Sequence, residues 1–458
     1  MTLTQAATRP PRLPGSLFMG SATALRRDAL GTLLAARRDH GDVVFVTAGP
    51  PGLRTEFYGV FHPDGVRRVL ANREAGYRKD NPHWQEMRDV LGNGIVVAQD
   101  EDWRTQRRAL QPLFTPQKVN SYAEIMAGET NRLMARWRAA EDGVVDVARD
   151  IGALTLQVIG RILFGDDLGS AVDIVQKNFP VINRYVLSRG LSPVRVPQSW
   201  PTPANRRMLA ARRNLYAMCD RIISGHRAAA ETDGGTNTDF VGLMMQSRTD
   251  GSASFDDEQI RDQVLLFMLA GHDTTASALM FAVHLLATHR DHQERAYAEV
   301  DSVLGGRDAT ADDLAAMPFL KMVLKETMRL YPSIPLVSRY TQTGDEVGGH
   351  AIPPASAVWT IPWVTHRHPE FWSDPERFDP DRFRPEAEAA RHRFAWFPFG
   401  AGPRSCIGEH LSMLELTVAL AGILRQFELK AVQTDVPVVA GIALSTPGDL
   451  HCVVAPRH

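Results

Sequence analysis

The chain has 458 residues, of which 44% are hydrophobic and 23% are charged, and its formal net charge is −2. These values are ordinary for a globular protein, and the nearly neutral charge gives no support for nucleic-acid binding. The three cysteines are an odd number in a long chain, which argues against a disulfide framework and for a reducing, cytoplasmic compartment. Because no linker-like stretch divides the chain, we expect residues 1–458 to form a single domain.

The N-terminal part of the chain predicts a surface arm followed by a short β region. Residues 1–20 include a proline-rich stretch that favours an extended arm, and they lack the apolar run of about 20 residues that a membrane anchor needs. An amphipathic helix is expected over residues 28–40, ended by Gly41. Strands are expected over residues 43–48 and 55–60, on either side of a Gly-Pro-Pro-Gly turn.

Helical periodicity dominates the chain after about residue 63. The exceptions are a β-prone stretch at residues 347–361 and short strands after residue 427. The predicted fold class is therefore mainly α with a minor β region.

A long helix is predicted over residues 259–288, and it holds an unusual group of residues near its middle. Gly271 costs about 1 kcal/mol relative to alanine inside a helix, so close approach of another group, such as a flat ligand, is one explanation for it. Asp273 is an ionisable residue in an apolar stretch, and the Thr274 hydroxyl can bond back to the preceding turn, at the carbonyl of Gly271. His272 points to another side and is interpreted as structural. The alternative is a solvated helix edge, which is common for such residues.

Cys406 follows a glycine-rich turn and precedes a helical run that starts at residue 409. Backbone N–H groups of the turn and the positive end of the helix both favour the thiolate, the form that ligates metals. A single cysteine presented in this way suits an axial haem ligand, because zinc and cluster sites need several ligands. Two alternatives are a buried apolar cysteine and a zinc site, for which His410 is the one further cue.

Three segments together resemble the cytochrome P450 family. Residues 399–408 match the haem-binding signature Phe-x-x-Gly-x-Arg-x-Cys-x-Gly, and residues 270–275 read Ala-Gly-x-Asp-Thr-Thr, like the oxygen-activation motif of the family. Residues 326–329 read Glu-x-x-Arg, a pattern that is weak alone but is followed here by a family-like segment at residues 375–383. The resemblance is to soluble bacterial members, and it implies one haem b (iron protoporphyrin IX) buried between two central helices.

The resemblance also implies roles for individual residues. Cys406 is expected to ligate the haem iron, with Phe399 shielding its sulfur and Gly271 close to the cofactor. Asp273 and Thr274 are expected to manage proton delivery to dioxygen. The haem propionates are expected to be bound by Trp103, Arg107, Arg339 and Arg404. Glu326, Arg329 and Arg382 are expected to form a structural brace that holds the cysteine loop in register.

The implied reaction is the insertion of one oxygen atom from dioxygen into a lipophilic small molecule, by hydroxylation or epoxidation, as in terpenoid, polyketide or macrolide metabolism. Electrons are expected from a separate ferredoxin or flavodoxin with its NAD(P)H-dependent reductase. A haem–thiolate peroxygenase or isomerase and a non-catalytic haem sensor are alternatives, which the Asp273–Thr274 pair disfavours. The expected substrate contacts are Trp84, Val96, Val97, Phe267, Leu336, Val337 and Leu444.

Overall fold

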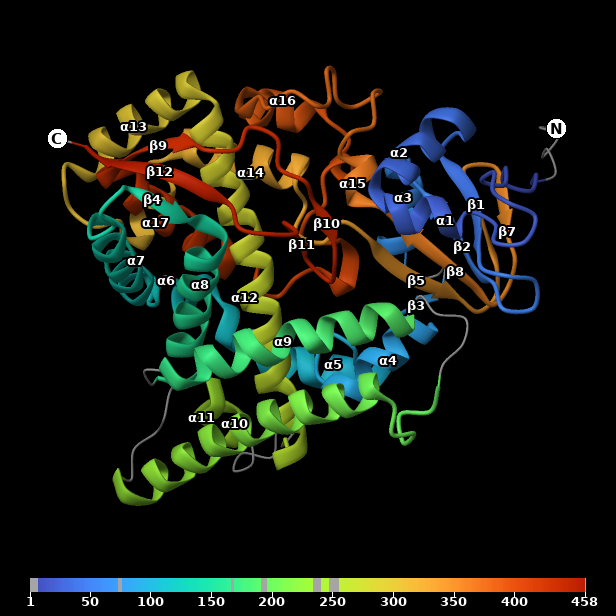
Figure 1. The fold of residues 1–458 in the computed structure, drawn as a ribbon, viewed down its shortest axis with the longest axis horizontal. Coiled ribbons are helices and arrows are strands. Elements are labelled where there is room, and N and C mark those ends of the chain that lie inside the picture. Colours follow the sequence, from blue (N-terminus) through green and yellow to red (C-terminus); the bar gives the residue numbers. More distant parts are fainter. Residues whose placement is uncertain are drawn as a thin grey trace.

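The computed structural model of the protein describes residues 7–72, 76–165, 169–190, 196–233, 240–246 and 255–457. Helices make up most of these residues, and the five-stranded sheet lies on the opposite side of the molecule from the three-stranded sheet of β4, β9 and β12 (Figure 1). The helices of the first half of the chain are α1 (Ala22–Arg27), α2 (Ala29–His40), α3 (Pro63–Ala71), α4 (Pro82–Leu91), α5 (Asp100–Leu110), α6 (Pro116–Asn120), α7 (Ala123–Arg138), α8 (Val147–Phe164), α9 (Gly169–Gly190) and α10 (Pro203–Asp233).

The second half contains the longest helix and the segment that carries Cys406. Its helices are α11 (Phe240–Gln246), α12 (Asp257–Thr288), α13 (Arg290–Leu304), α14 (Pro318–Leu330), α15 (Pro362–Thr365), α16 (Pro385–Ala390) and α17 (Glu409–Gln426). The short 3-10 turns are η1 (Gln111–Phe114), η2 (Ala311–Leu314), η3 (Pro380–Phe383), η4 (Arg393–Ala395) and η5 (Gly402–Arg404).

The largest sheet joins strands near the N-terminus to strands within residues 337–360. Its strand order is β1-β2-β8-β5-β3, and β2 and β8 pair in parallel while the other neighbours are antiparallel. Two further sheets are hairpins, and one has three strands in the order β4-β12-β9. The strands are β1 (Val43–Ala48), β2 (Thr55–Val60), β3 (Tyr77–Arg78), β4 (Val144–Asp146), β5 (Val337–Thr341), β6 (Asp345–Val347), β7 (His350–Ile352), β8 (Ser356–Thr360), β9 (Phe427–Ala431), β10 (Val439–Ala440), β11 (Leu444–Ser445) and β12 (His451–Pro456).

The N-terminal arm is extended and lies against this β region over its described part. Thr8 N–H donates to the Gly349 carbonyl at 3.1 Å, and Leu13 N–H donates to the Phe45 carbonyl at 2.8 Å. Residues 1–6 of the predicted arm lie outside the described residues. The predicted strands 43–48 and 55–60 are confirmed as β1 and β2.

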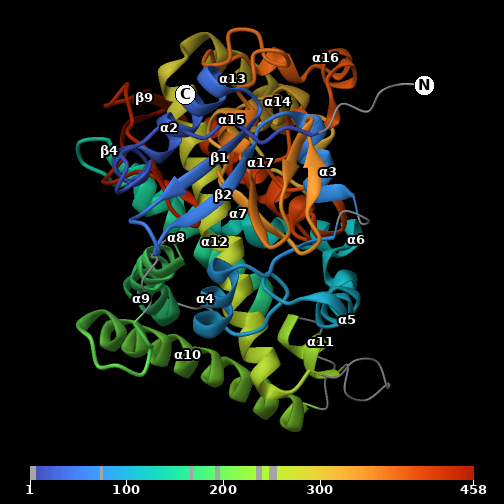
Figure 2. The ribbon, with the colours of Figure 1, turned by 90° about the vertical axis from the view of Figure 1, so that its right-hand side faces the viewer.

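Helix α12 passes through the middle of the molecule (Figures 1 and 2). It begins with a capping box in which Asp256 and Gln259 satisfy each other's backbone N–H groups. Most of its side chains are buried, so it is apolar on nearly every face. Among the described residues it is the one helix long and apolar enough to cross a membrane, but 72% of that window is buried in protein, as expected for a core helix.

Helix α8 packs directly on α12, and this contact accounts for Gly271. A Cβ atom at Gly271 would lie 2.7 Å from Cγ1 of Ile159 on α8. Nearby, the Thr155 hydroxyl lies 3.0 Å from Nδ1 of His272, so His272 is a buried packing residue, as predicted. The missing side chain of Gly271 therefore makes room for a neighbouring helix, and its expected contact with a cofactor stays a prediction.

Candidate active site

Cys406 lies in a tight turn between η5 and α17, and two glycines shape the turn. Gly400 and Gly402 have φ angles of 69° and 70°, a left-handed conformation that favours glycine. A Cβ atom at Gly402 would also lie 2.2 Å from the Leu70 carbonyl oxygen. The Cys406 N–H donates to the Phe399 carbonyl at 2.9 Å, which closes the turn and leaves the Cys406 side chain exposed at its surface.

The electrostatic surroundings of the Cys406 thiol differ from the expectation. Desolvation by the surrounding protein raises its pKa, and this effect outweighs the Gly408 N–H and the positive charges of Arg107 and Lys79, which lower it. The predicted direction of the backbone contribution is thus correct, but the net shift for the free thiol is upward. The reason is the protein packed around the cysteine loop, which desolvates the sulfur although the side chain is accessible, and a local motif does not report such packing.

Three cations converge near this cysteine, and two of them were predicted. Burial lowers the pKa of Arg339 to about 10 and that of Arg404 to about 9, and the two guanidinium groups interact. Lys79, which sequence reasoning did not single out, is half-buried beside them, and its pKa is lowered by desolvation and by both arginines. Their nearest oxygen partners are backbone carbonyls, at Ser338, Ala98 and Val96. Among the described residues no carboxylate contributes to the electrostatic surroundings of these three charges.

The other predicted binding residues lie on the same side of the cysteine loop. Arg107 on α5 donates to the Ser405 carbonyl at 3.1 Å, one residue before Cys406. The Arg404 guanidinium lies 4.2 Å from the ring centre of Trp103, also on α5. Phe399 is half-buried, with its ring edge-on to Trp396. The structure therefore brings the predicted binding residues into one neighbourhood.

The predicted brace is present as a buried charge network. Arg329 binds the Glu326 carboxylate through two bonds, of 2.6 and 2.8 Å, and both side chains are fully buried. Arg382 lies 3.4 Å from the same carboxylate, and the Asp379 N–H donates to it at 2.9 Å. Burial raises the pKa of Glu326, and Arg329 opposes this shift most strongly. The charges are compensated without exposure to water.

The brace reaches the cysteine loop through two contacts. Arg329 also donates to the His366 carbonyl at 3.1 Å, and Nε2 of His366 accepts the Phe397 N–H at 2.9 Å. The Trp396 indole N–H donates to the carbonyl of Lys325, next to Glu326, at 3.2 Å. These bonds connect α14 to the residues directly before the Cys406 turn. Neither His366 nor Trp396 stands out in the sequence.

On α12, Asp273 and Thr274 lie side by side in different surroundings. The Thr274 hydroxyl donates to the Ala270 carbonyl at 2.6 Å, one residue earlier than the predicted acceptor, Gly271, because an i to i−4 bond fits the helix turn. Asp273 accepts a bond from Asn183 of α9 at 3.3 Å and lies 3.3 Å from His272. Burial raises the pKa of Asp273, while His272 and Asn183 lower it.

The predicted substrate contacts lie around these elements, mostly in one apolar cluster. Val97, Phe267 and Leu444 are buried in the main core, and Trp84, Val96 and Leu336 pack against it, whereas Val337 packs against a second cluster beneath the sheet. The Leu444 N–H donates to the Ser333 carbonyl, and the Ser333 hydroxyl donates to the Thr274 carbonyl, both at 2.8 Å. The loop carrying Leu444 is thus fastened to α12 next to Thr274.

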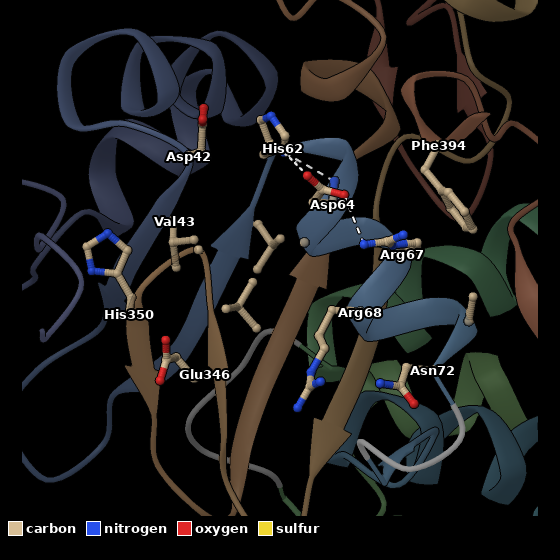
Figure 3. A pocket seen from close by; sticks show the side chains of 15 residues that line it. Asp42, Val43, His62, Asp64, Arg67, Arg68, Asn72, Glu346, His350 and Phe394 are labelled. Atoms are coloured by element: carbon tan, nitrogen blue, oxygen red, sulfur yellow. Dashed lines mark hydrogen bonds and ion pairs between the residues drawn. The ribbon is translucent and has the colours of Figure 1, made fainter. Parts of the chain in front are cut away.

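A surface groove elsewhere does not involve these residues. Figure 3 shows its wall of charged side chains between α3, the ends of β1 and β2, and the β6–β7 hairpin. The groove has a volume of about 950 Å³, and no predicted site residue lines it. Its charges largely compensate one another, as in the 3.2 Å contact between Arg67 and Asp64. We therefore do not assign the active site to this groove.

Comparison with known proteins identifies the family. The family model described as Cytochrome P450 matches residues 10–453. The chain belongs to the cytochrome P450 family. Cyclooctatin synthase of Streptomyces melanosporofaciens is 35% identical over 94% of this chain and 93% of its own length. Pentalenene oxygenase of Streptomyces avermitilis is 30% identical over 96% of this chain and 94% of its own length.

A solved structure agrees with this assignment. The crystal structure of the cytochrome P450DA heme domain matches with a TM-score of 0.88 and 25% identity, over 99% of both chains. The protein is therefore a cytochrome P450 monooxygenase with a haem–thiolate cofactor. The family match sets aside the alternatives of a zinc enzyme and a haem sensor.

The residues of the site fit a haem. Arg339 is a buried cation, Lys79 and Arg404 are half-buried cations, and no carboxylate of the described chain balances their charges, which haem propionates would balance. Cys406 lies close enough to Lys79 and Arg107 to interact with their charges, so a sulfur ligand and the cations meet in one place. A flat dianion with a metal at its centre is complementary to this arrangement.

We expect Glu326→Ala to produce protein that loses haem, because Arg329 and Arg382 would remain as unpaired buried charges, at a cost of about 3–5 kcal/mol. Haem content and thermal unfolding measure this effect. Glu388→Ala is the control, since Glu388 forms an ion pair with the neighbouring Lys325 but is 40% exposed. Normal haem content in Glu326→Ala would contradict the brace.

We expect the site to be acid-sensitive through His366, because burial lowers its pKa to about 3. The folded-state pKa of His366 is below the unfolded value of about 6.5. The stabilising contribution of the neutral imidazole to the free energy of unfolding is therefore fully present above pH 6.5 and decreases as the pH falls toward 3. The loss between pH 6.5 and 5 is about 2 kcal/mol, measured as the free energy of unfolding. His366→Asn is expected to show a shallower pH dependence, and equal slopes would contradict the assignment.

Proposed function

We propose that this cytochrome P450 oxygenates a cyclic terpenoid, at a C–H or a C=C bond. The observation that carries the proposal is the meeting of Cys406, the uncompensated cations and the Asp273–Thr274 pair around one apolar cluster. The substrate class is supported by relatives whose names describe oxygenation of pentalenene and of cyclooctat-9-en-7-ol, an alkene and an alkenol. A polyketide or macrolide has no comparable support.

In this proposal the cofactor is held from two sides. Cys406 would ligate the iron, Phe399 would cover the sulfur, and the N–H of Gly408 would face the thiolate. The propionates would be bound by Arg339, Arg404 and Lys79, with Trp103 and Arg107 completing the group. When bound, the haem supplies activation of dioxygen, and a thiolate ligand favours cleavage of the O–O bond. The protein contributes orientation, exclusion of water and the movement of protons.

Proton transfer is assigned to the two polar residues at the middle of α12. The Thr274 hydroxyl already has a bond to the Ala270 carbonyl, which fixes its oxygen at one side of the helix. Asp273 is the acid that resupplies protons, and its raised pKa keeps part of it protonated at a higher pH than an exposed aspartate. Asn183 and His272, each 3.3 Å from an oxygen of its carboxyl group, hold Asp273 in place.

Substrate selection is assigned to side chains around the same helix. Phe267 is stacked on Phe114 at 5.5 Å between ring centres and meets Phe240 edge-on, so it offers a rigid apolar surface. Trp84 is held by a bond from its indole N–H to the Ser338 carbonyl.

In this proposal a separate ferredoxin or flavodoxin, reduced by its reductase, supplies the electrons.

We expect replacement of Cys406 by His to abolish the red-shifted carbon monoxide band that thiolate ligation gives. Cys219→Ala and Cys452→Ala are the controls, because both cysteines are buried and burial raises the pKa of each, to about 12 and about 11. Difference spectra of the reduced enzyme test this. Loss of the band in either control would overturn the assignment of Cys406.

We expect Thr274→Ala to bind substrate with nearly unchanged affinity but to couple reductant use poorly to product formation. Loss of a general acid–base group typically costs about 10²–10⁴-fold, and here the loss is expected as released hydrogen peroxide. Asp273→Asn is expected to slow turnover with less leakage. The measurement is product and peroxide formed per NAD(P)H, with a cyclic terpene alcohol found by a spin-shift screen as substrate. Full coupling in Thr274→Ala would contradict the role in proton transfer.

A further inference from the structure

A buried ion pair joins α4, which carries Trp84, to α9, which carries the Asn183 partner of Asp273. Glu86 of α4 and Arg189 of α9 form two bonds, of 2.8 Å between Oε2 and Nε and 2.9 Å between Oε1 and Nη2. Their side chains are 6% and 14% exposed. Paired, nearly buried bonds of this kind hold two elements in one relative orientation. Figures 1 and 2 show α9 alongside α4, at the end of the molecule where α10 also lies.

The α9 side of this pair is fixed in the structure. Arg189 also donates to the Val196 carbonyl at 2.5 Å, and its guanidinium lies 5.3 Å from the ring centre of Tyr185. The Tyr185 hydroxyl bonds to the amide oxygen of the buried Asn205, at the start of α10, at 2.9 Å. Arg189 is therefore part of a network that ties α9 to α10.

The C-terminal end of α4 is fastened to α12 instead. The Asn93 N–H donates to the Asp262 carboxylate at 2.7 Å, and the Ile95 N–H donates to the Gln263 side chain at 3.1 Å. Gly92, with a φ angle of 83°, fits so closely that a Cβ atom there would overlap Asp262. Helix α4 is thus anchored at one end on the core helix and joined to α9 through Glu86.

We propose that Glu86 and Arg189 are positioning residues that close α4 against α9, and that their ion pair determines how long a bulky lipophilic ligand remains in the site. The inference rests on the proposed function, since it takes Trp84, two residues before Glu86, as part of the substrate wall. Opening would separate two desolvated charges, which costs free energy, so loss of the ion pair is expected to make opening and the release of a bulky ligand faster. A ligand as small as imidazole is expected to leave without this opening.

The test compares two probes on the haem-loaded enzyme, the bulky azole econazole and the small ligand imidazole. We expect Glu86→Gln to raise the dissociation rate constant of econazole about tenfold or more and that of imidazole less than about twofold. Stopped-flow absorbance of the haem band measures both. An equal change for the two probes, or no change for econazole, would overturn the proposal.

Two further variants separate the pair from general loosening. Arg189→Gln is expected to act like Glu86→Gln, and the double variant is expected to be no faster than either single variant, because one interaction is removed once. Glu129→Gln is the matched control, since Glu129 is also buried and pairs with Arg161 of α8 at 2.5 Å. If Glu129→Gln raises the dissociation rate constant of econazole as much as Glu86→Gln does, the proposal is overturned.

The azole dissociation measurement does not depend on whether the substrate is a terpenoid. Azole dissociation requires a haem in the site but no oxidation of a terpenoid. Failure of terpenoid oxidation with a size-dependent effect of Glu86→Gln would reject the proposed substrate class and support the pair. Normal oxidation with no such effect would reject the pair and support the proposed function.

Discussion

The burial of the Glu326 carboxylate is the constraint on which the site depends. A fully buried carboxylate needs opposite charge and hydrogen bonds, and here Arg329, Arg382 and the Asp379 N–H supply them. Because Arg329 has further N–H groups, the same side chain also binds the carbonyls of His366, Pro375 and Arg377. The need to compensate the Glu326 charge therefore fixes several connecting segments around α14. Through His366, which accepts the Phe397 N–H, the same network also holds the residues before Cys406.

Near Cys406 the uncompensated charges are positive, whereas the buried charge of the brace is negative. Lys79, Arg339 and Arg404 come from three separate parts of the chain, and each meets backbone carbonyls where the brace offers carboxylates. Positive charge without acidic partners selects for an anionic ligand at that place. The fold thus contains one charge network that is complete within the protein and a second that is complementary to a cofactor.

Local patterns predicted the parts of the fold that local forces determine. Strands 43–48 and 55–60 have the predicted bounds, and the helix expected from residue 259 begins at Asp257, where Asp256 caps it. Strand β3 was not predicted, because its two residues are strand only through pairing with the distant β5.

Contacts distant in sequence decide the remaining features of the site. The sequence shows that Gly271 is unfavourable inside a helix, but it does not show that glycine is needed there because Ile159 of another helix packs against it. Lys79 and His366 carry no motif, and their importance comes from burial and from partners far along the chain. The upward net pKa shift of Cys406 follows from desolvation by protein atoms that surround the loop.

The parallel pairing of β2 with β8 has a consequence for biosynthesis. Tyr58 pairs with Val358, 300 positions later in the chain. At about 5–20 residues per second, a ribosome takes roughly 15–60 s to add the intervening residues. During that time the β1–β2 hairpin has an open edge, which in other proteins favours association with foreign strands. The nascent chain therefore depends on protection of this edge until β8 emerges, so the rate of translation and the supply of chaperones influence the yield of the enzyme.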